Sequence, residues 1–135
     1  MRRRPTRRSV ALALATLGLL SASAGGAGAP ARFTGQVTDA LRNPTHRLAA
    51  SAASGRAVAD LVFVDAKQAH TTVRTCVLRR DVPAGTRTCF TLTTGAAGVA
   101  TVTPLRFAPG RYVVRWSVGG DLVARWRFVV VSSKD

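Results

Sequence analysis

The segment from Pro109 to Val131 constrains the fold more than any other stretch, because its side chains alternate in character on either side of a Gly-Gly turn. Alternation with a period of two places successive side chains on opposite faces of a β-sheet. One set is apolar or aromatic and comprises Tyr112, Val114, Trp116, Val118, Leu122, Ala124, Trp126, Phe128 and Val130. The set in between contains Arg111, Arg115, Arg125 and Arg127. We therefore expect a β-hairpin with a core face and a basic face.

The register of this hairpin follows from the requirement that core residues face core residues across the two strands. A two-residue turn at 119–120 would set Val114 opposite Arg125 and mix core with surface. A three-residue loop at 119–121 avoids this, and hairpin loops of that length with a glycine are common. The apolar pairs that it predicts are Val118–Leu122, Trp116–Ala124, Val114–Trp126 and Tyr112–Phe128.

The predicted register also sets Arg115 opposite Arg125 on the other face of the hairpin. Like charges directly opposite each other destabilise a sheet. Two interpretations stay open: the aliphatic stems of the arginines cover neighbouring valines, or the charged face binds an acidic partner. In the second interpretation the candidate binding patch is Arg111, Arg115, Arg125 and Arg127.

Further short strands are predicted upstream, where β-branched and apolar runs are separated by turn signals such as Asn43-Pro44. The predicted strands are 32–38, 56–65, 71–79, 86–93, 99–103, 111–118 and 122–131. Segment 48–55 fits either a loop or an irregular strand, and Pro104 is expected to end the fifth strand. About seven strands without a helix predict an all-β, immunoglobulin-like antiparallel β-sandwich over residues 32–135.

The only two cysteines, Cys76 and Cys89, lie on two strands predicted to be neighbours. If they are directly opposite, the centre of the hairpin falls between Val82 and Pro83, inside a segment with turn character. We therefore predict a disulfide, as expected for an even cysteine pair in a small exported domain. A redox-active pair is the alternative, but the C-x-x-C motif typical of one is missing.

The first 24 residues predict a signal peptide. Five arginines are followed by an apolar run of eleven residues, Val10 to Leu20, and then by small residues, which is the order of an export signal. Cleavage is predicted before Gly25, after Ala22-Ser23-Ala24, with a cut near Ala29 as the alternative and 25–31 as a flexible lead-in. An uncleaved anchor is the other interpretation, although a helix needs about 20 apolar residues to span a bilayer.

These features predict a secreted or periplasmic protein with no membrane span in its mature form. The run Thr6-Arg7-Arg8-Ser9-Val10 also resembles a twin-arginine signal, an alternative export route. Fifteen of the 20 Lys and Arg residues lie beyond the leader, against six aspartates, so the mature domain carries a net charge of about +9. Such a charge favours an anionic envelope polymer or another exported protein as partner. Nucleic acid is not expected, because exported proteins seldom meet it.

The pattern P-G-x-Y-x-V-x-W-x-V followed by F-x-V resembles the last hairpin of many bacterial exported immunoglobulin-like domains. Its residues here are Pro109, Gly110, Tyr112, Val114, Trp116, Val118, Phe128 and Val130. The resemblance implies that Tyr112 forms a tyrosine corner. The hairpin is also similar to that of the copper-resistance C type periplasmic proteins, whose turn carries an Asp-Gly-His copper motif. Here the turn is Gly-Gly-Asp and the predicted mature start lacks a histidine, so no metal or other cofactor is expected.

Catalytic motifs are not found, and we expect no enzymatic activity. Ser117 is predicted on the outer face, Asp60 and Asp65 on opposite faces of one strand, and His46 and His70 in polar connections. The sequence thus predicts an exported, non-enzymatic binding or structural module of the cell envelope. Two alternatives remain: a copper carrier of related fold, and a protease inhibitor that uses the disulfide-closed loop from Arg79 to Arg87.

Overall fold

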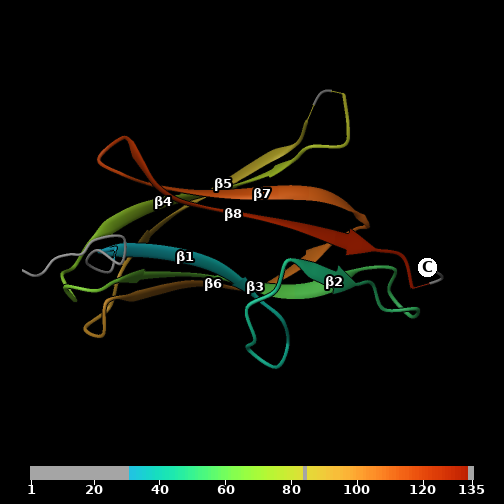
Figure 1. Ribbon diagram of the computed structural model, residues 1–135, viewed down its shortest axis with the longest axis horizontal. Helices are drawn as coiled ribbons and strands as arrows, with labels where there is room; N and C mark the ends of the chain where they lie inside the picture. The colour runs from blue at the N-terminus through green and yellow to red at the C-terminus, as the bar shows by residue number, and fades with distance from the viewer. Residues whose placement is uncertain (1–30, 84, 134–135) are drawn as a thin grey trace, which may run out of the picture. The chain divides into compact units, whose positions relative to one another are not determined.

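The computed structural model describes residues 31–83 and 85–133, and in this part of the chain it is all-β (Figure 1). Eight strands are present among the described residues. They are β1 (Phe33–Thr38), β2 (Arg47–Ala49), β3 (Ala57–Asp65), β4 (Thr72–Arg79), β5 (Arg87–Thr93), β6 (Val99–Phe107), β7 (Gly110–Val118) and β8 (Asp121–Val131). The predicted signal peptide, residues 1–24, lies outside the described residues. No helix in the described ranges has the length and apolar character needed to cross a membrane.

The strands form two sheets that pack face to face (Figure 1). One sheet has the order β1-β3-β6, and the other has the order β2-β8-β7-β4-β5. Strands β4, β7 and β8 correspond to the C, F and G strands of immunoglobulin-like sandwiches, and β1, β3 and β6 correspond to A, B and E. The predicted fold class, an immunoglobulin-like β-sandwich, is therefore confirmed.

The core lies between the two sheets and is centred on Trp116, whose side chain is completely buried. The indole packs against the backbone of β1 at Gly35, where a Cβ atom would come within 2.6 Å of the Trp116 Cδ2 atom. Phe107, Tyr112 and Phe128 form an aromatic cluster in which each pair of ring centroids is 5.1 Å apart. These residues come from the inward set of the closing hairpin and from the end of β6, so the predicted core face of the hairpin is confirmed at Tyr112, Trp116 and Phe128 but not at Leu122.

The predicted tyrosine corner is present at the start of β7. The Tyr112 hydroxyl donates a hydrogen bond of 2.7 Å to the backbone carbonyl of Ala108, four residues upstream. This bond ties the β6–β7 connection to the aromatic cluster. It also gives the buried hydroxyl a partner, as buried polar groups require.

The strand count differs from the prediction of about seven because a short strand, β2, forms where the sequence allowed only a loop or an irregular strand. Strand β2 runs parallel to β8, with Leu48 beside Val130 and Ala49 beside Val131. Leu48 is buried beneath this contact. Three residues give too little periodicity to indicate a strand, and the pairing partner lies more than 80 residues away.

Strand β6 continues through Pro104 to Phe107, so the prediction that the strand ends at Pro104 was wrong. The physical reason is its position at the edge of the three-stranded sheet, beside β3 alone. Proline has no N–H group to donate, and an edge strand tolerates that because one side of it faces no partner strand.

The closing hairpin has the predicted register over most of its length, but the predicted three-residue loop is wrong. Tyr112 faces Phe128, Val114 faces Trp126, Trp116 faces Ala124 and Arg115 faces Arg125, all as predicted. Nearer the turn a β-bulge shifts the pairing, so that Ser117 faces Leu122 and Val118 faces Asp121.

The turn itself consists of Gly119 and Gly120, which have φ angles of +61° and +89°. Positive φ at both central residues is typical of the tight hairpin turn that matches strand twist. The predicted loop contained Asp121 as its third residue; in the structure Asp121 pairs with Val118, and the bulge leaves Val123 as the unpaired residue instead. As a consequence Leu122 lies on the outer face and is 55% exposed, instead of joining the core.

Candidate binding surface

The outer face of the five-stranded sheet gathers arginines from all five of its strands or their immediate ends. On β7 and β8 the outward positions hold Arg111, Arg115, Arg125 and Arg127, which are the four residues of the predicted patch. The strand register adds four more arginines to the same face. These are Arg47 on β2, Arg74 on β4, Arg80 just after β4 and Arg87 on β5. All eight are exposed, and we call this set the basic face.

The arginines of the basic face have no acidic partners among the residues that the structure describes. Both ion pairs in that part of the chain lie elsewhere: Arg32 pairs with Asp65, and Arg79 pairs with Asp81. Two further aspartates bond to neighbouring groups. Asp39 accepts hydrogen bonds from backbone N–H groups of its own loop, and Asp60 accepts one from Thr103. In the described part of the chain, no ion pair therefore joins an arginine of the basic face to an aspartate.

The burial of Val113 indicates that the arginine side chains also cover apolar residues on the outer face of the sheet. It lies on the outward side of β7, opposite Arg127 and beside Leu78, yet only 1% of it is exposed. An outward valine can be buried to that extent only when neighbouring side chains lie over it. Long arginine stems can do this while their guanidinium groups stay in water. Covering and binding are thus compatible roles of the same side chains.

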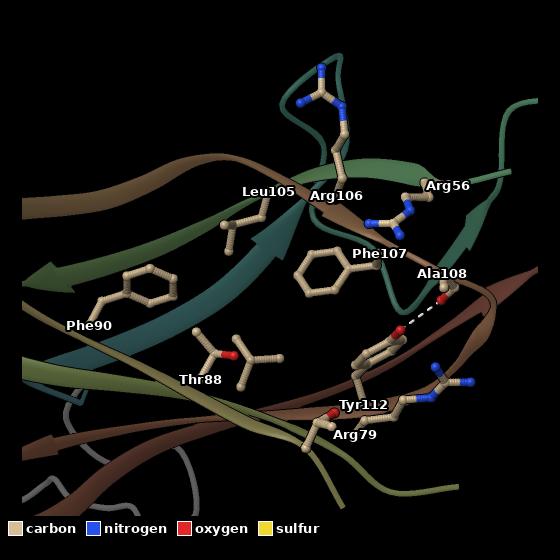
Figure 2. A pocket seen from close by; sticks show the side chains of 11 residues that line it. Arg56, Arg79, Thr88, Phe90, Leu105, Arg106, Phe107, Ala108 and Tyr112 are labelled. Carbon is tan, nitrogen blue, oxygen red and sulfur yellow. Dashed lines mark hydrogen bonds between the residues drawn. The ribbon is translucent and has the colours of Figure 1, made fainter. Parts of the chain in front are cut away.

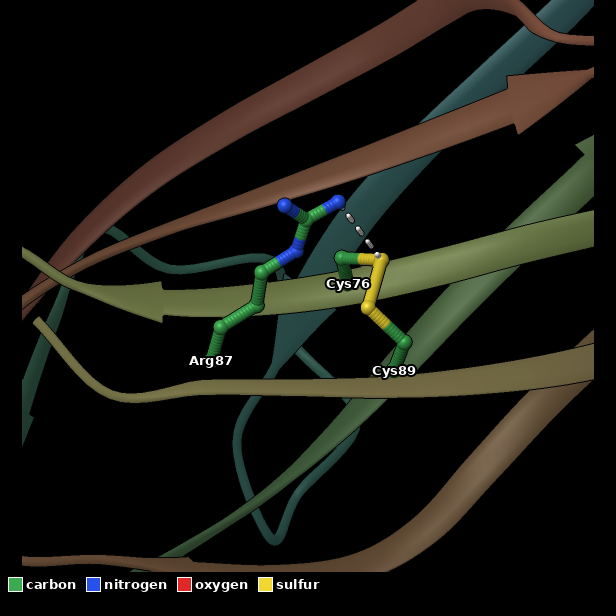
Figure 3. The surroundings of a disulfide bond; sticks show 3 residues. All are labelled: Cys76, Arg87 and Cys89. Carbon is green, nitrogen blue, oxygen red and sulfur yellow. Dashed lines mark hydrogen bonds between the residues drawn. A yellow bond between two sulfur atoms is a disulfide. The ribbon is translucent and has the colours of Figure 1, made fainter.

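A hollow of about 440 Å³ opens in the basic face above the disulfide. Four arginines surround it, and its remaining lining is mainly apolar. The lining residues are Arg74, Arg87, Arg115, Arg125, Cys76, Leu78, Ser117, Gly120 and Leu122. The predicted disulfide is confirmed, with Cys76 directly opposite Cys89 on β4 and β5. Figure 3 shows the Arg87 side chain reaching over the bond, with its Nη2 atom 4.0 Å from the Cys76 sulfur.

A second hollow, of about 270 Å³, lies where β5 and β6 approach each other at the open side of the sandwich (Figure 2). Two of its polar side chains, those of Arg79 and Tyr112, are already hydrogen-bonded. The Arg79 guanidinium is held by Asp81 and by the carbonyl of Pro109, and lies 5.9 Å from the centre of the Tyr112 ring. The Tyr112 hydroxyl is bonded to Ala108, and burial raises its pKa. The other cations in its lining are the two exposed residues Arg56 and Arg106, whereas four arginines surround the hollow above the disulfide.

The loop that a protease inhibitor would use, from Arg79 to Arg87, connects β4 to β5. Arg79, at its start, has its guanidinium bound to Asp81 at 2.9 Å and turned toward Pro109, so it is not presented outward. Arg80 is exposed, but it belongs to the basic face. No contact in the described part of the loop favours insertion of a basic side chain into a protease.

The two histidines make separate contacts. The His46 ring stacks on Trp126 with centroids 4.0 Å apart, and its Nδ1 atom is 2.6 Å from the carbonyl oxygen of Arg127. His70 Nδ1 lies 3.2 Å from the carbonyl oxygen of Thr94. Within the described ranges no group of three or more His, Cys, Asp or Glu residues could hold a metal ion.

The predicted positions of the other polar candidates agree with the structure. Ser117 lies on the outer face among arginines, with no described histidine beside it. Asp65 is completely buried, whereas Asp60 lies on the opposite side of β3 next to Thr103. The two carboxylates are therefore separated by the sheet, as the odd spacing indicated.

Sequence reasoning missed half of the basic face. Arg74 and Arg87 could have been found, because the predicted disulfide aligns β4 with β5 and alternation then places both on the disulfide side. Arg47 and Arg80 gave no such signal. One lies on a strand too short to recognise, and the other lies just beyond the end of β4.

No protein-family model matches the sequence, and no curated protein matches it. Among solved structures, the chain is similar to the Pseudomonas fluorescens alkylpurine DNA glycosylase AlkC bound to DNA containing an abasic site analog. The sequence identity is 16%, the TM-score is 0.41, and the match covers 75% of this chain. This chain spans only 31% of the glycosylase chain. A likeness of that extent carries no argument about function.

Proposed function

We propose that the domain is an exported, non-enzymatic binding module of the cell envelope, and that its basic face holds an anionic polymer. The observation that carries the proposal is the set of eight exposed arginines on one sheet face, without a described acidic partner. Like charges brought together on a sheet weaken it unless something else compensates them. A polyanion lying across the face supplies that compensation.

The chemistry of the side chains suits this role. All eight cations are arginines, whose planar guanidinium groups bind phosphate and carboxylate oxygens in pairs and stay charged at any physiological pH. The β-strands that carry them are linked by continuous ladders and, at β4 and β5, by the disulfide. A rigid sheet presents the charges without the loss of conformational entropy that a flexible tail would suffer on binding.

The test is retention on an anionic column, with heparin and an anionic wall polymer as the two immobilised probes. The double variant Arg115→Glu/Arg125→Glu reverses the directly opposed pair at the centre of the face. We expect it to lose retention at moderate salt while keeping its melting temperature, since both residues are exposed.

The matched control is Arg56→Glu/Arg106→Glu, which makes the same change in net charge at two exposed residues outside the basic face. The control should keep most of its retention. Equal losses in both variants would mean that net charge alone holds the protein on the column. Full retention of the Arg115→Glu/Arg125→Glu variant would disprove a binding role of the basic face.

A further inference from the structure

The four arginines around the hollow above the disulfide come from four neighbouring strands. Arg125 on β8 faces Arg115 on β7, and Arg115 in turn faces Cys76 on β4. Arg87 lies on β5, two pairs along the ladder from Cys89. Neighbouring strands are about 4.8 Å apart, so the four strands place these charges along a path of roughly 14 Å across the sheet. Arg115 and Arg125 thus lie in the row of the disulfide, whereas Arg74 and Arg87 lie two residues to either side of that row, so the four arginines surround the hollow.

The four arginines around the hollow carry more positive charge than one carboxylate would neutralise. A carboxylate offers two oxygens in one plane, whereas a phosphodiester, which carries one negative charge, offers two charged oxygens and two ester oxygens arranged as a tetrahedron. Several guanidinium groups can bind one phosphate at the same time, each through paired N–H groups. A path of about 14 Å also has room for successive charged groups of a chain. The hollow therefore fits repeated phosphates better than isolated carboxylates.

The apolar part of the lining indicates which chemical groups would connect the phosphates. It is formed mainly by the Cys76 sulfur, Leu78 and Leu122, with Ser117 as the only uncharged side chain that has a hydroxyl in the lining. Leu122 is 55% exposed, a large apolar side chain left at the surface by the β-bulge. Carbon-rich linkers between phosphate groups would cover this apolar surface and remove it from water. A chain made of phosphate groups alone has no carbon atoms with which to cover this apolar surface.

Nucleic acid is also a phosphate polymer, but the basic face lacks what single strands need. Proteins that bind single-stranded nucleic acid stack bases on aromatic side chains. In the described strands both tryptophans and Tyr112 belong to the inward set, and no outward position of the five-stranded sheet is aromatic. The linkers that fit are therefore aliphatic and carry no bases.

From these observations we infer that the hollow is a subsite for a phosphodiester polymer with short aliphatic linkers, which lies across the strands from Arg125 to Arg87. The inference rests on the proposed function and narrows it to one class of polymer. It assigns a binding role to Arg74 and Arg87, which lie outside the patch that the sequence indicated.

The experiment measures the affinity of soluble poly(glycerol phosphate) for three forms of the protein by titration calorimetry. The hollow variant is Arg74→Gln/Arg87→Gln. Its matched control is Arg47→Gln/Arg80→Gln, which removes the same charge from exposed positions on the same face but outside the hollow. We expect the hollow variant to bind about tenfold more weakly or worse, because charge-assisted hydrogen bonds are lost, and the control to change about threefold or less.

Two further probes test the chemical class on the unaltered protein. One is an oligothymidylate with the same number of phosphates, and the other is poly-glutamate with the same number of charges. Both should bind more weakly than poly(glycerol phosphate). If either binds as tightly, the inferred class of polymer is wrong. Equal losses in the hollow variant and its control would overturn the subsite while leaving the basic face as a diffuse binding surface. If none of the three polymers binds, the subsite fails together with the proposed function.

Discussion

Arg32 and Asp65 form a paired contact that joins the start of β1 to the end of β3. The Arg32 Nε atom donates to Asp65 Oδ1 at 3.0 Å and its Nη2 atom donates to Oδ2 at 3.1 Å. The Asp65 side chain is fully buried, while that of Arg32 is 41% exposed. Thr71 and the backbone N–H of Lys67 donate to the same carboxylate. The four hydrogen bonds to this buried carboxylate hold the surrounding segments of the sandwich in place.

The first prediction concerns the dependence of stability on pH. Hydrogen bonds from Arg32 and Thr71 hold the pKa of Asp65 well below its usual range. In the unfolded chain the pKa of an aspartate is about 3.9, so the contribution of this group is complete above that pH and is lost as the pH falls below it. We expect Asp65→Asn to be less stable at pH 7 and to lose less stability than the unaltered protein between pH 6 and 3. Urea unfolding at several pH values measures both effects.

The control for this prediction is Asp121→Asn, an exposed residue at the start of β8. It should have nearly the stability and the acid response of the unaltered protein. If the Asp65→Asn protein loses as much stability on acidification as the unaltered protein, another carboxylate dominates acid unfolding.

The second prediction concerns the contact between β1 and the central tryptophan. A methyl group at Gly35 would lie within 2.6 Å of the Trp116 ring, and that ring is completely buried and has no room to move. Overpacking of this kind costs about 1–3 kcal/mol. We expect Gly35→Ala to lower the free energy of unfolding by that amount, measured by denaturant titration. Gly95→Ala is the control, because its nearest neighbouring atom would be 3.9 Å from the new Cβ. A Gly35→Ala protein as stable as the control would contradict the packing described.

The third prediction concerns the disulfide. Cys76 and Cys89 are separated by 13 residues, and closing a loop of that length stabilises a fold by about 3 kcal/mol in the chain-entropy model. We expect Cys76→Ser/Cys89→Ser to lower the free energy of unfolding by up to this amount. The fold should persist, because β4 also pairs with β7 through a separate ladder. Circular dichroism checks the fold and denaturant titration the stability. Complete unfolding of the double variant would show that the disulfide is essential.

The fourth prediction concerns the tyrosine corner. Tyr112→Phe removes the hydroxyl that bonds to Ala108 and leaves the ring in the aromatic cluster. A hydrogen bond of this kind is worth about 1 kcal/mol. We expect a loss of that size in the free energy of unfolding, with unchanged binding to anionic polymers since Tyr112 faces the core. A change in polymer affinity without a change in stability would place Tyr112 in the binding surface instead.

Much of the fold could be predicted because local alternation and the cysteine spacing encode it. Alternation along β7 and β8 predicted the core pairs around Trp116, and it placed Arg115 opposite Arg125. The spacing of Cys76 and Cys89 predicted both the disulfide and the pairing of β4 with β5. Each of these inferences involves residues within one hairpin, where neighbours in sequence are also neighbours in space.

The basic face was only partly predictable, because it is assembled from strands that are distant in sequence. Four of its eight arginines lie on the closing hairpin, and the other four lie on or beside β2, β4 and β5. These arginines lie on the same side of the sheet because β4 pairs with β7 and β2 pairs with β8. Such pairings are selected by burial between sheets, which a single strand does not encode.

The closing hairpin separates what the sequence alone determined from what only the tertiary structure decided. Its alternation determined that Tyr112, Val114, Trp116 and Phe128 face the core and that the arginines between them face out, because side chains in a strand must alternate. The two-residue turn, the bulge and the exposed position of Leu122 came from the tertiary structure. A bulge costs little locally, so the choice between it and a longer loop depends on how the twisted strands fit the opposite sheet.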